Sequence, residues 1–280
     1  MPPEKSKAAR EILAFYLEAG VDAALGETPV DRFAEQAAAP SVAVPSVAER
    51  PPGRAPAPSR AVSANIPAAP PAAAKAAPPT PEAAVMAARE AARGAASLEE
   101  LRAIVAAFDG CALKATARQA VFADGTPGSR IMFVGEAPGR EEDLEGLPFV
   151  GRSGQLLDRM MAAIGLSRRN AYIANIIPWR PPGNRTPTPQ EQAICLPFIV
   201  RQIELCDPDV LVCLGGPSAA ALLGVKEGIT RIRGRWFPYS TGRDIRAIAT
   251  LHPAYLLRQP LQKRLAWRDF LAVKKALEAP

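Results

Sequence analysis

The fold is indicated most clearly by residues 130–139, RIMFVGEAPG, in which an apolar run leads directly into a turn rich in glycine and proline. Three more β-rich runs follow along the chain, and helical patterns separate them. We expect strands at 130–135, 171–177, 209–215 and 246–251, and helices at 154–164, 189–205, 217–223 and 260–277. This alternation predicts an α/β fold around a mainly parallel sheet, with a ligand site beyond the carboxyl ends of the strands.

Composition places the chain among ordinary globular proteins. Of its 280 residues, 48% are apolar and 22% are charged. No apolar stretch approaches the roughly 18 residues that are needed to cross a bilayer. The charged N-terminus lacks the apolar core of a secretion signal, and four cysteines are too few for a disulfide scaffold. We therefore expect a cytoplasmic protein without a membrane partner.

Proline divides the chain into segments. Residues 37–81 hold 12 of the 30 prolines and no aromatic side chain, which predicts a disordered Pro/Ala-rich linker. Before the linker, residues 1–36 contain a short amphipathic helix that either docks on the main domain or binds an unknown protein partner. After the linker, we expect a helical lead-in over 82–107 and one folded domain over 108–280.

The basic excess belongs to the folded domain, since residues 109–280 carry 23 basic and 16 acidic side chains. Arg231, Arg233 and Arg235 alternate along a short strand-like run, which would place all three on one face. Arg258 and further basic residues follow near the last helix. A solvated face and a nucleic-acid surface are both compatible with this excess.

Side chains that can carry chemistry follow the expected strands. The turn after the first strand contains Glu136, and its glycines allow backbone N–H groups to approach a ligand. Glu142 and Phe149 come next, and an aromatic ring at a strand end is well placed to stack on a flat ligand. Asn175 lies inside the second apolar run, where an amide needs partners. His252, the only histidine, follows the fourth run.

In this order, the motifs resemble those of the type-4 (family 4) uracil-DNA glycosylases. The resemblance rests on 135–139 with 146–151, on Asn175 with 180–185, and on 252–255, and it covers nearly the whole folded domain. It implies a three-layer α/β/α fold with a small, mainly parallel sheet. It also implies a DNA N-glycosylase that hydrolyses the N-glycosidic bond of deoxyuridine, leaves an abasic site and starts base-excision repair. The partner would be DNA with uracil or another damaged base, and the protein would associate with the nucleoid.

The resemblance also implies roles for single residues. Phe149 would stack on a flipped-out uracil, and Asn175 would bond its O4 and N3–H edge. His252 would donate a hydrogen bond to O2, where negative charge collects, and Glu136 or Glu142 would position water or stabilise the sugar cation. The remaining expected contacts are to uracil from Gly135 and Ala137, and to DNA from Arg185, Arg233, Arg235, Arg258 and an apolar wedge at Leu256 or Tyr255.

One feature of the family is missing from this sequence. Members usually hold a [4Fe–4S] cluster through four cysteines, and the matching positions here are Cys111, Lys114, Trp179 and Cys195. Such a cluster needs four soft ligands, and neither an ammonium nor an indole supplies one. We therefore expect no cofactor, with the Trp179 ring filling the space and making a cation–π contact with Lys114.

Two other functions remain as alternatives. A protein that binds or traps damaged bases or abasic sites with little turnover would share most of the motifs. Trapping relatives carry an extra basic loop just before the histidine, and no such insertion lies between Ile245 and His252. A phosphate-binding module built on the glycine-rich turn would bind nucleotides and not DNA.

Overall fold

The computed structural model describes residues 80–278. The predicted N-terminal helix and nearly all of the predicted linker lie outside the described residues, which include only Thr80 and Pro81 of the linker. Within residues 80–278, no helix is both long and apolar enough to cross a membrane.

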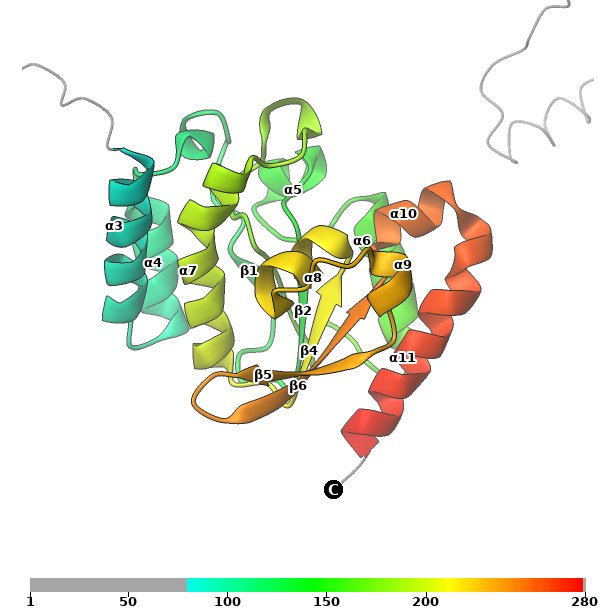
Figure 1. The fold of residues 1–280 in the computed structure, drawn as a ribbon. Coiled ribbons are helices and arrows are strands. Elements are labelled where there is room, and N and C mark those ends of the chain that lie inside the picture. Colours follow the sequence, from blue (N-terminus) through cyan, green and yellow to red (C-terminus); the bar gives the residue numbers. More distant parts are fainter. Residues whose placement is uncertain (1–79, 279–280) are drawn as a thin grey trace, which may run out of the picture. The chain divides into compact units, whose positions relative to one another are not determined.

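Six strands of the described chain form one sheet in the order β1-β3-β2-β4-β6-β5 (Figure 1). The four inner strands are parallel to one another and match the four predicted runs; they are β2 (Ile131–Gly135), β3 (Tyr172–Asn175), β4 (Val210–Leu214) and β6 (Asp244–Thr250). Two short strands that the sequence patterns do not predict, β1 (Ala123–Gly125) and β5 (Trp236–Ser240), pair antiparallel at the edges. The mainly parallel sheet is therefore confirmed.

Alternate side chains of the inner strands enter two separate cores, so the fold has three layers. Met132 and Val134 of β2 belong to a core shared with α3, α4, α7 and α8, whereas Ile131 and Phe133 belong to a core shared with α6 and α11. Because helices cover both faces, β2 and β4 are buried along their whole length, whereas β6 begins with the exposed Asp244 and Arg246 before it becomes apolar. The helices are α3 (Pro81–Gly94), α4 (Leu98–Ala107), α5 (Arg140–Glu145), α6 (Arg152–Ala162), α7 (Pro189–Cys206), α8 (Gly216–Leu223), α9 (Ile229–Ile232), α10 (Pro253–Arg258) and α11 (Lys263–Glu278), with short 3-10 turns η1 (Ala112–Ala115), η2 (Pro182–Asn184) and η3 (Pro260–Gln262).

Three helices begin at side-chain caps. Thr80 and Ser97 accept backbone N–H groups at the starts of α3 and α4. At the start of α7, Thr188 and Glu191 form a complete capping box. Helices α3 and α4 pack against α7, so the helical lead-in shares the core of the sheet.

The arginine-rich run after α8 is not a strand. Ile229–Ile232 forms the helical turn α9, and β5 begins only at Trp236. Arg231, Arg233 and Arg235 therefore do not alternate along one face of a strand, and that prediction is wrong. The helical turn fully buries its last isoleucine. This packing outweighs the alternating pattern of charges.

Candidate functional site

A cavity of about 690 Å³ opens at the carboxyl ends of the parallel strands. The segments that leave β2, β3, β4 and β6 all contribute to its wall, as expected for an open α/β sheet. Its volume is in the range that small-molecule and cofactor sites occupy. Of the residues predicted from the sequence, the lining includes Glu136, Ala137, Glu142, Phe149, Asn175, Arg185, His252, Tyr255 and Arg258.

Gly135 and Asn175 are register partners where β2 and β3 end. A Cβ atom on Gly135 would lie 2.4 Å from Asn175 Oδ1 and 2.6 Å from Phe149 Cζ. Both distances are far too short for a real Cβ atom. Only glycine therefore lets the amide and the aromatic ring approach the end of β2 this closely.

The Asn175 side chain has an unused hydrogen-bonding atom. The residue is buried, yet Oδ1 has no hydrogen-bond partner within the described residues. Since buried polar groups normally have partners, an unpaired oxygen beside a cavity indicates a ligand that donates a hydrogen bond there. A carboxamide also carries N–H donors in the same plane, so it matches a ligand edge with adjacent donor and acceptor groups.

The rings of Phe149 and His252 form a pair in the cavity wall. Their centroids are 5.6 Å apart and their planes are tilted by 31°. The backbone of Phe149 has a φ of 56°, in the left-handed region that bulky residues rarely adopt. The side chain is buried against the sheet and offers an apolar surface to a planar ligand.

His252 presents a neutral hydrogen-bond donor. Its Nδ1 accepts the backbone N–H of Ala254 at 3.1 Å, at the start of α10. Burial lowers the pKa of His252 to about 4, and the positive charge of Arg258 acts in the same direction. The imidazole is therefore uncharged at neutral pH. Because Nδ1 is an acceptor, its single proton lies on Nε2.

The two candidate carboxylates have different surroundings. Glu142 accepts the backbone N–H groups of Gly139, Val150 and Gly151 at 3.0–3.1 Å, so both of its oxygens hold the loops around Phe149. Glu136 has one buried oxygen, Oε1, without a hydrogen-bond partner in the described structure. Burial raises the pKa of Glu136. Of the two, Glu136 is the one with an oxygen available to a ligand or to water.

The residues expected to contact DNA separate into two groups. Arg185, Tyr255 and Arg258 line the cavity. Arg233 does not, because its guanidinium is bonded to Asp269 and to the Leu265 carbonyl and so ties α9 to α11. Arg235 also lies outside the lining, where it pairs with Glu227 at 3.2 Å.

The prediction that Leu256 is a wedge is wrong. Its exposed fraction is 0%, because it lies on the inner face of α10 and packs with Leu156, Leu251 and Ala266. Leu261, which the sequence reasoning missed, is instead 85% exposed in η3, the turn that packs against α10. A run of apolar residues does not reveal which of its members faces outward.

Further residues of the cavity wall that the sequence patterns did not indicate lie at the starts of helices. Arg152 and Ser153 of α6 line the cavity, as do Gly215 and Gly216 where β4 meets α8. Gly215 and Gly216 could have been found from the sequence, because they form a glycine pair at the end of the third predicted strand and ligands bind at strand ends. Nothing in the sequence marks the α6 residues, which reach the cavity only through the path of the loop that precedes them.

The positions that match the cluster cysteines do not form a four-ligand site. Cys111 and Cys195 are buried with their Sγ atoms 3.9 Å apart. The Lys114 ammonium is bonded to Asp109 at 2.7 Å, and the cation–π contacts of the described chain do not include the predicted pair with Trp179. Over residues 80–278, no three His, Cys, Asp or Glu side chains are grouped to hold a metal ion. This donor set does not fit a [4Fe–4S] cluster.

The fold and the cavity together define a three-layer α/β protein whose cavity, at the carboxyl end of the sheet, combines an aromatic ring with an unpartnered amide oxygen. Comparison with known proteins agrees with this class, since residues 122–271 match the family described as the uracil DNA glycosylase superfamily. The chain therefore belongs to the uracil DNA glycosylase superfamily, as the sequence motifs predicted.

Similar proteins include two named type-4 uracil-DNA glycosylases. The one from Thermotoga maritima is 45% identical over 149 residues, which cover 53% of this chain and 77% of that protein. The one from Archaeoglobus fulgidus is 39% identical over 179 residues, which cover 62% of this chain and 90% of that protein. The matched part of the chain thus corresponds to most of the length of each relative.

Proposed function

We propose that this protein hydrolyses the N-glycosidic bond of deoxyuridine in DNA and leaves an abasic site. The observation that carries the proposal is the unpaired Asn175 oxygen, which lies beside the Phe149 and His252 rings in a cavity of suitable size. Similarity to proteins named type-4 uracil-DNA glycosylase supports the reaction class. Hydrolysis of this bond starts base-excision repair.

Base recognition would use the flat ring and the amide. A base inside a duplex cannot reach the cavity, so the nucleotide must flip out of the stack. Phe149 then stacks on the pyrimidine, Asn175 Oδ1 accepts its N3–H, and the Asn175 amide donates to O4. Cytosine has an acceptor at N3 and a donor at C4, which reverses both bonds. The amide therefore favours uracil over cytosine.

Bond cleavage would use His252 and Glu136. As the N1–C1′ bond breaks, the uracil ring takes the electron pair, and its O2 becomes more negative. The neutral Nε2–H of His252 donates to that oxygen, and so stabilises charge that develops only in the transition state. The Glu136 carboxylate orients a water molecule toward C1′ and stabilises the positive sugar, and the water's proton passes to the carboxylate. Glu142 holds the loops and takes no part in proton transfer.

A single assay tests the activity. A duplex oligonucleotide with one uracil is incubated with the protein and then heated in alkali, which cleaves the strand at an abasic site. Strand cleavage is expected for the uracil duplex and not for a matched thymine duplex. If treatment with well-folded protein and then alkali cleaves no uracil-containing strand, the proposal fails. If a protein–DNA adduct persists on a denaturing gel, the trapping alternative is favoured instead.

The activity should depend on the ionisation of Glu136. Burial raises the pKa of this carboxyl above its usual 4.5, and the water-orienting role needs the carboxylate. Activity should therefore fall about tenfold per pH unit as the pH drops below the raised pKa. We expect an acid limb in kcat/KM above pH 4.5 for the parent protein and no such limb in the residual activity of Glu136→Gln. An unchanged acid limb in the variant would assign it to another group.

The strongly exposed Leu261 is our candidate for the apolar wedge in place of Leu256. Its turn, η3, is separated by one residue from Arg258, which lines the cavity. Basic residues Lys263 and Arg264 come next along the chain and are exposed. An exposed apolar side chain among cations suits insertion between base steps with phosphates nearby. Arg185, Arg235 and Arg258 supply further phosphate contacts in this proposal.

Leu261→Ala should lower kcat/KM on duplex substrate by about tenfold and on single-stranded substrate much less, because only the duplex must be unstacked. Leu271→Ala is the matched control, since Leu271 is an exposed leucine on α11, 43% accessible. Both substrates carry the same uracil and are compared under single-turnover conditions. If Leu261→Ala lowers kcat/KM equally on duplex and single-stranded substrate, or if Leu271→Ala lowers it as much on the duplex, Leu261 is not the wedge.

We propose that the folded enzyme carries no iron–sulfur cluster. The two thiols of Cys111 and Cys195 cannot bind four irons, and the positions of Lys114 and Trp179 are taken by a salt bridge and a buried ring. Protein purified without oxygen should be colourless and free of stoichiometric iron. Brown protein with four irons per chain would contradict this.

Activity on other damaged bases, nucleoid association and a partner for the N-terminal helix remain predictions.

A further inference from the structure

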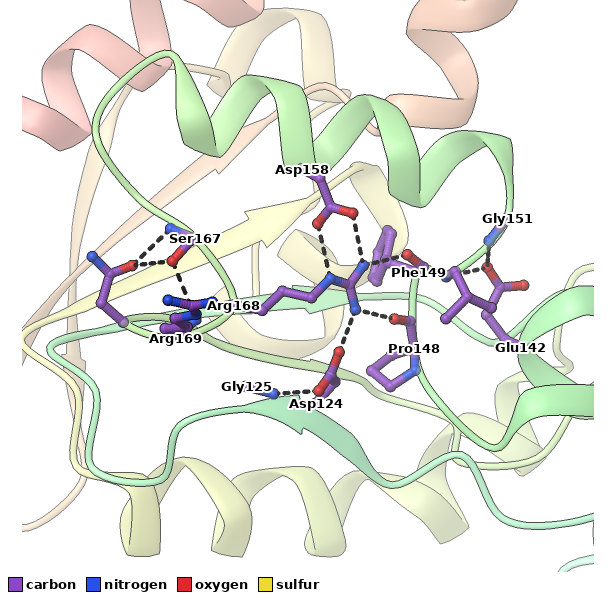
Figure 2. A network of polar contacts seen from close by, with 12 residues as sticks. Asp124, Gly125, Glu142, Pro148, Phe149, Gly151, Asp158, Ser167, Arg168 and Arg169 are labelled. Atoms are coloured by element: carbon purple, nitrogen blue, oxygen red, sulfur yellow. Dashed lines mark hydrogen bonds and ion pairs between the residues drawn. The ribbon is translucent and has the colours of Figure 1, made fainter.

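Arg168, in the loop between α6 and β3, uses all five of its N–H donors inside the protein (Figure 2). Nε donates to Asp158 Oδ1 at 2.9 Å, and Nη1 donates to Asp124 Oδ2 at 2.5 Å and to the Pro148 carbonyl at 3.0 Å. Nη2 donates to the Phe149 carbonyl and, at 3.4 Å, to Asp158 Oδ2. The two carboxylates fix the guanidinium, and the guanidinium in turn holds two consecutive carbonyls.

The second of those carbonyls belongs to the residue with the unusual backbone. Phe149 is held in the left-handed region, and three groups fix it there. Arg168 bonds its carbonyl on one side. Glu142 accepts the next two backbone N–H groups on the other side. Gly154 leaves room behind it, since a Cβ there would lie 1.6 Å from the Phe149 oxygen.

The position of the Phe149 ring follows from this backbone. Its edge sits over Gly135, where a Cβ would lie 2.6 Å from Phe149 Cζ, and its face is tilted toward the ring of His252. If residue 149 returned to the ordinary β or α region, its side chain would point elsewhere, because φ sets the direction of Cα–Cβ relative to the loop. The contacts of Arg168 therefore determine where the Phe149 ring lies in the cavity wall, although Arg168 does not itself line the cavity.

We propose that Arg168 is a positioning residue that holds the Phe149 ring in place for stacking on the flipped base. The proposal rests on the proposed glycosylase function for its substrate. Arg168 itself does not line the cavity, so it acts only through Phe149. Arginine is needed because its planar fork reaches two carboxylates and two carbonyls together. A lysine keeps the charge but has three donors and no fork.

The first test measures inhibition by free uracil, which needs the stacking surface but no DNA. Arg168→Lys should raise the inhibition constant for uracil by about tenfold or more. Asp124→Asn is the matched control, since it removes one ion pair of the same guanidinium and leaves both carbonyl contacts. It should lower the melting temperature but change the uracil constant by no more than about twofold. If both variants weaken uracil binding equally, the loss does not come from the two carbonyl contacts of Arg168, and the proposal fails.

A double-variant cycle tests whether Arg168 acts through the ring. Phe149→Ala removes the stacking surface, so adding Arg168→Lys to it should have almost no further effect on uracil inhibition. Independent losses that multiply in the double variant would overturn the proposal. If Arg168→Lys does not fold, a triple variant with Arg168→Gln, Asp124→Asn and Asp158→Asn replaces it, because it removes the three partly buried charges together and leaves none of them unpaired.

A spectroscopic readout separates this proposal from the proposed function. The untagged protein has one histidine, so the ring C–H signals of His252 are unique in a proton NMR spectrum. The nearby Phe149 ring shifts those signals through its ring current. Arg168→Lys should move them in the direction that Phe149→Ala does, and Asp124→Asn should not. If the parent protein excises no uracil, the function fails but this shift still tests the positioning; if Arg168→Lys leaves the signals unmoved, the positioning fails.

Discussion

The His252→Ala variant is expected to excise uracil roughly 10²–10³-fold more slowly than the parent protein. The Nε2–H of the neutral imidazole is the group that would donate to uracil O2, and the burial that lowers the pKa of His252 to about 4 keeps it neutral. The donor acts on charge that develops as the glycosidic bond breaks. The loss should therefore appear in the single-turnover rate and much less in the affinity for DNA.

Two observations check this assignment. A duplex with 5-fluorouracil, whose anion is a better leaving group, should be excised by His252→Ala with a smaller loss than a uracil duplex. In the parent protein, activity should not increase as the pH falls from 7 to 5, because a group with a pKa of about 4 gains its proton only below that range. An activity that rises on acidification through pH 6 would mean that the charged imidazolium is the donor.

The Trp179→Ala variant is expected to lose about 3–5 kcal/mol of unfolding free energy. Trp179 is 1% exposed and belongs to the core that also holds Cys111 and Cys195. It thus fills space at positions where cluster-binding relatives would place cysteine. Removing the indole leaves a cavity that two thiols and the salt-bridged Lys114 cannot fill.

Urea unfolding followed by far-UV circular dichroism measures this loss. Trp267→Ala is the matched control, because Trp267 is 43% exposed on α11 and its removal opens no cavity. We expect the control to change the unfolding free energy by less than about 1 kcal/mol. A similar small change for Trp179→Ala would show that the ring does not take the structural place of a cluster.

Several features of the fold follow from local pattern and were predictable for that reason. The inner strands β2 and β4 are continuous apolar runs because helices cover both faces of the sheet, so no alternation was needed to find them. The edge strands were not predictable. β1 is three residues long and ends in Asp-Gly, and β5 contains Pro238, which only an edge strand accommodates readily. Pairing with a neighbour, rather than propensity, makes them strands.

The candidate site divides in the same way. The sequence by itself determined the family, the strand ends that form the cavity and the chemical types of Phe149, Asn175 and His252, because each follows or ends a recognisable apolar run. Tertiary structure decided which carboxylate has an oxygen available to a ligand. Only packing brings the backbone N–H groups of Gly139, Val150 and Gly151 to the oxygens of Glu142. It also decided that Leu256 is buried and Leu261 exposed, and that Arg168 holds the Phe149 loop. These outcomes depend on contacts between segments far apart in the chain, and residue types and spacing carry no record of such contacts.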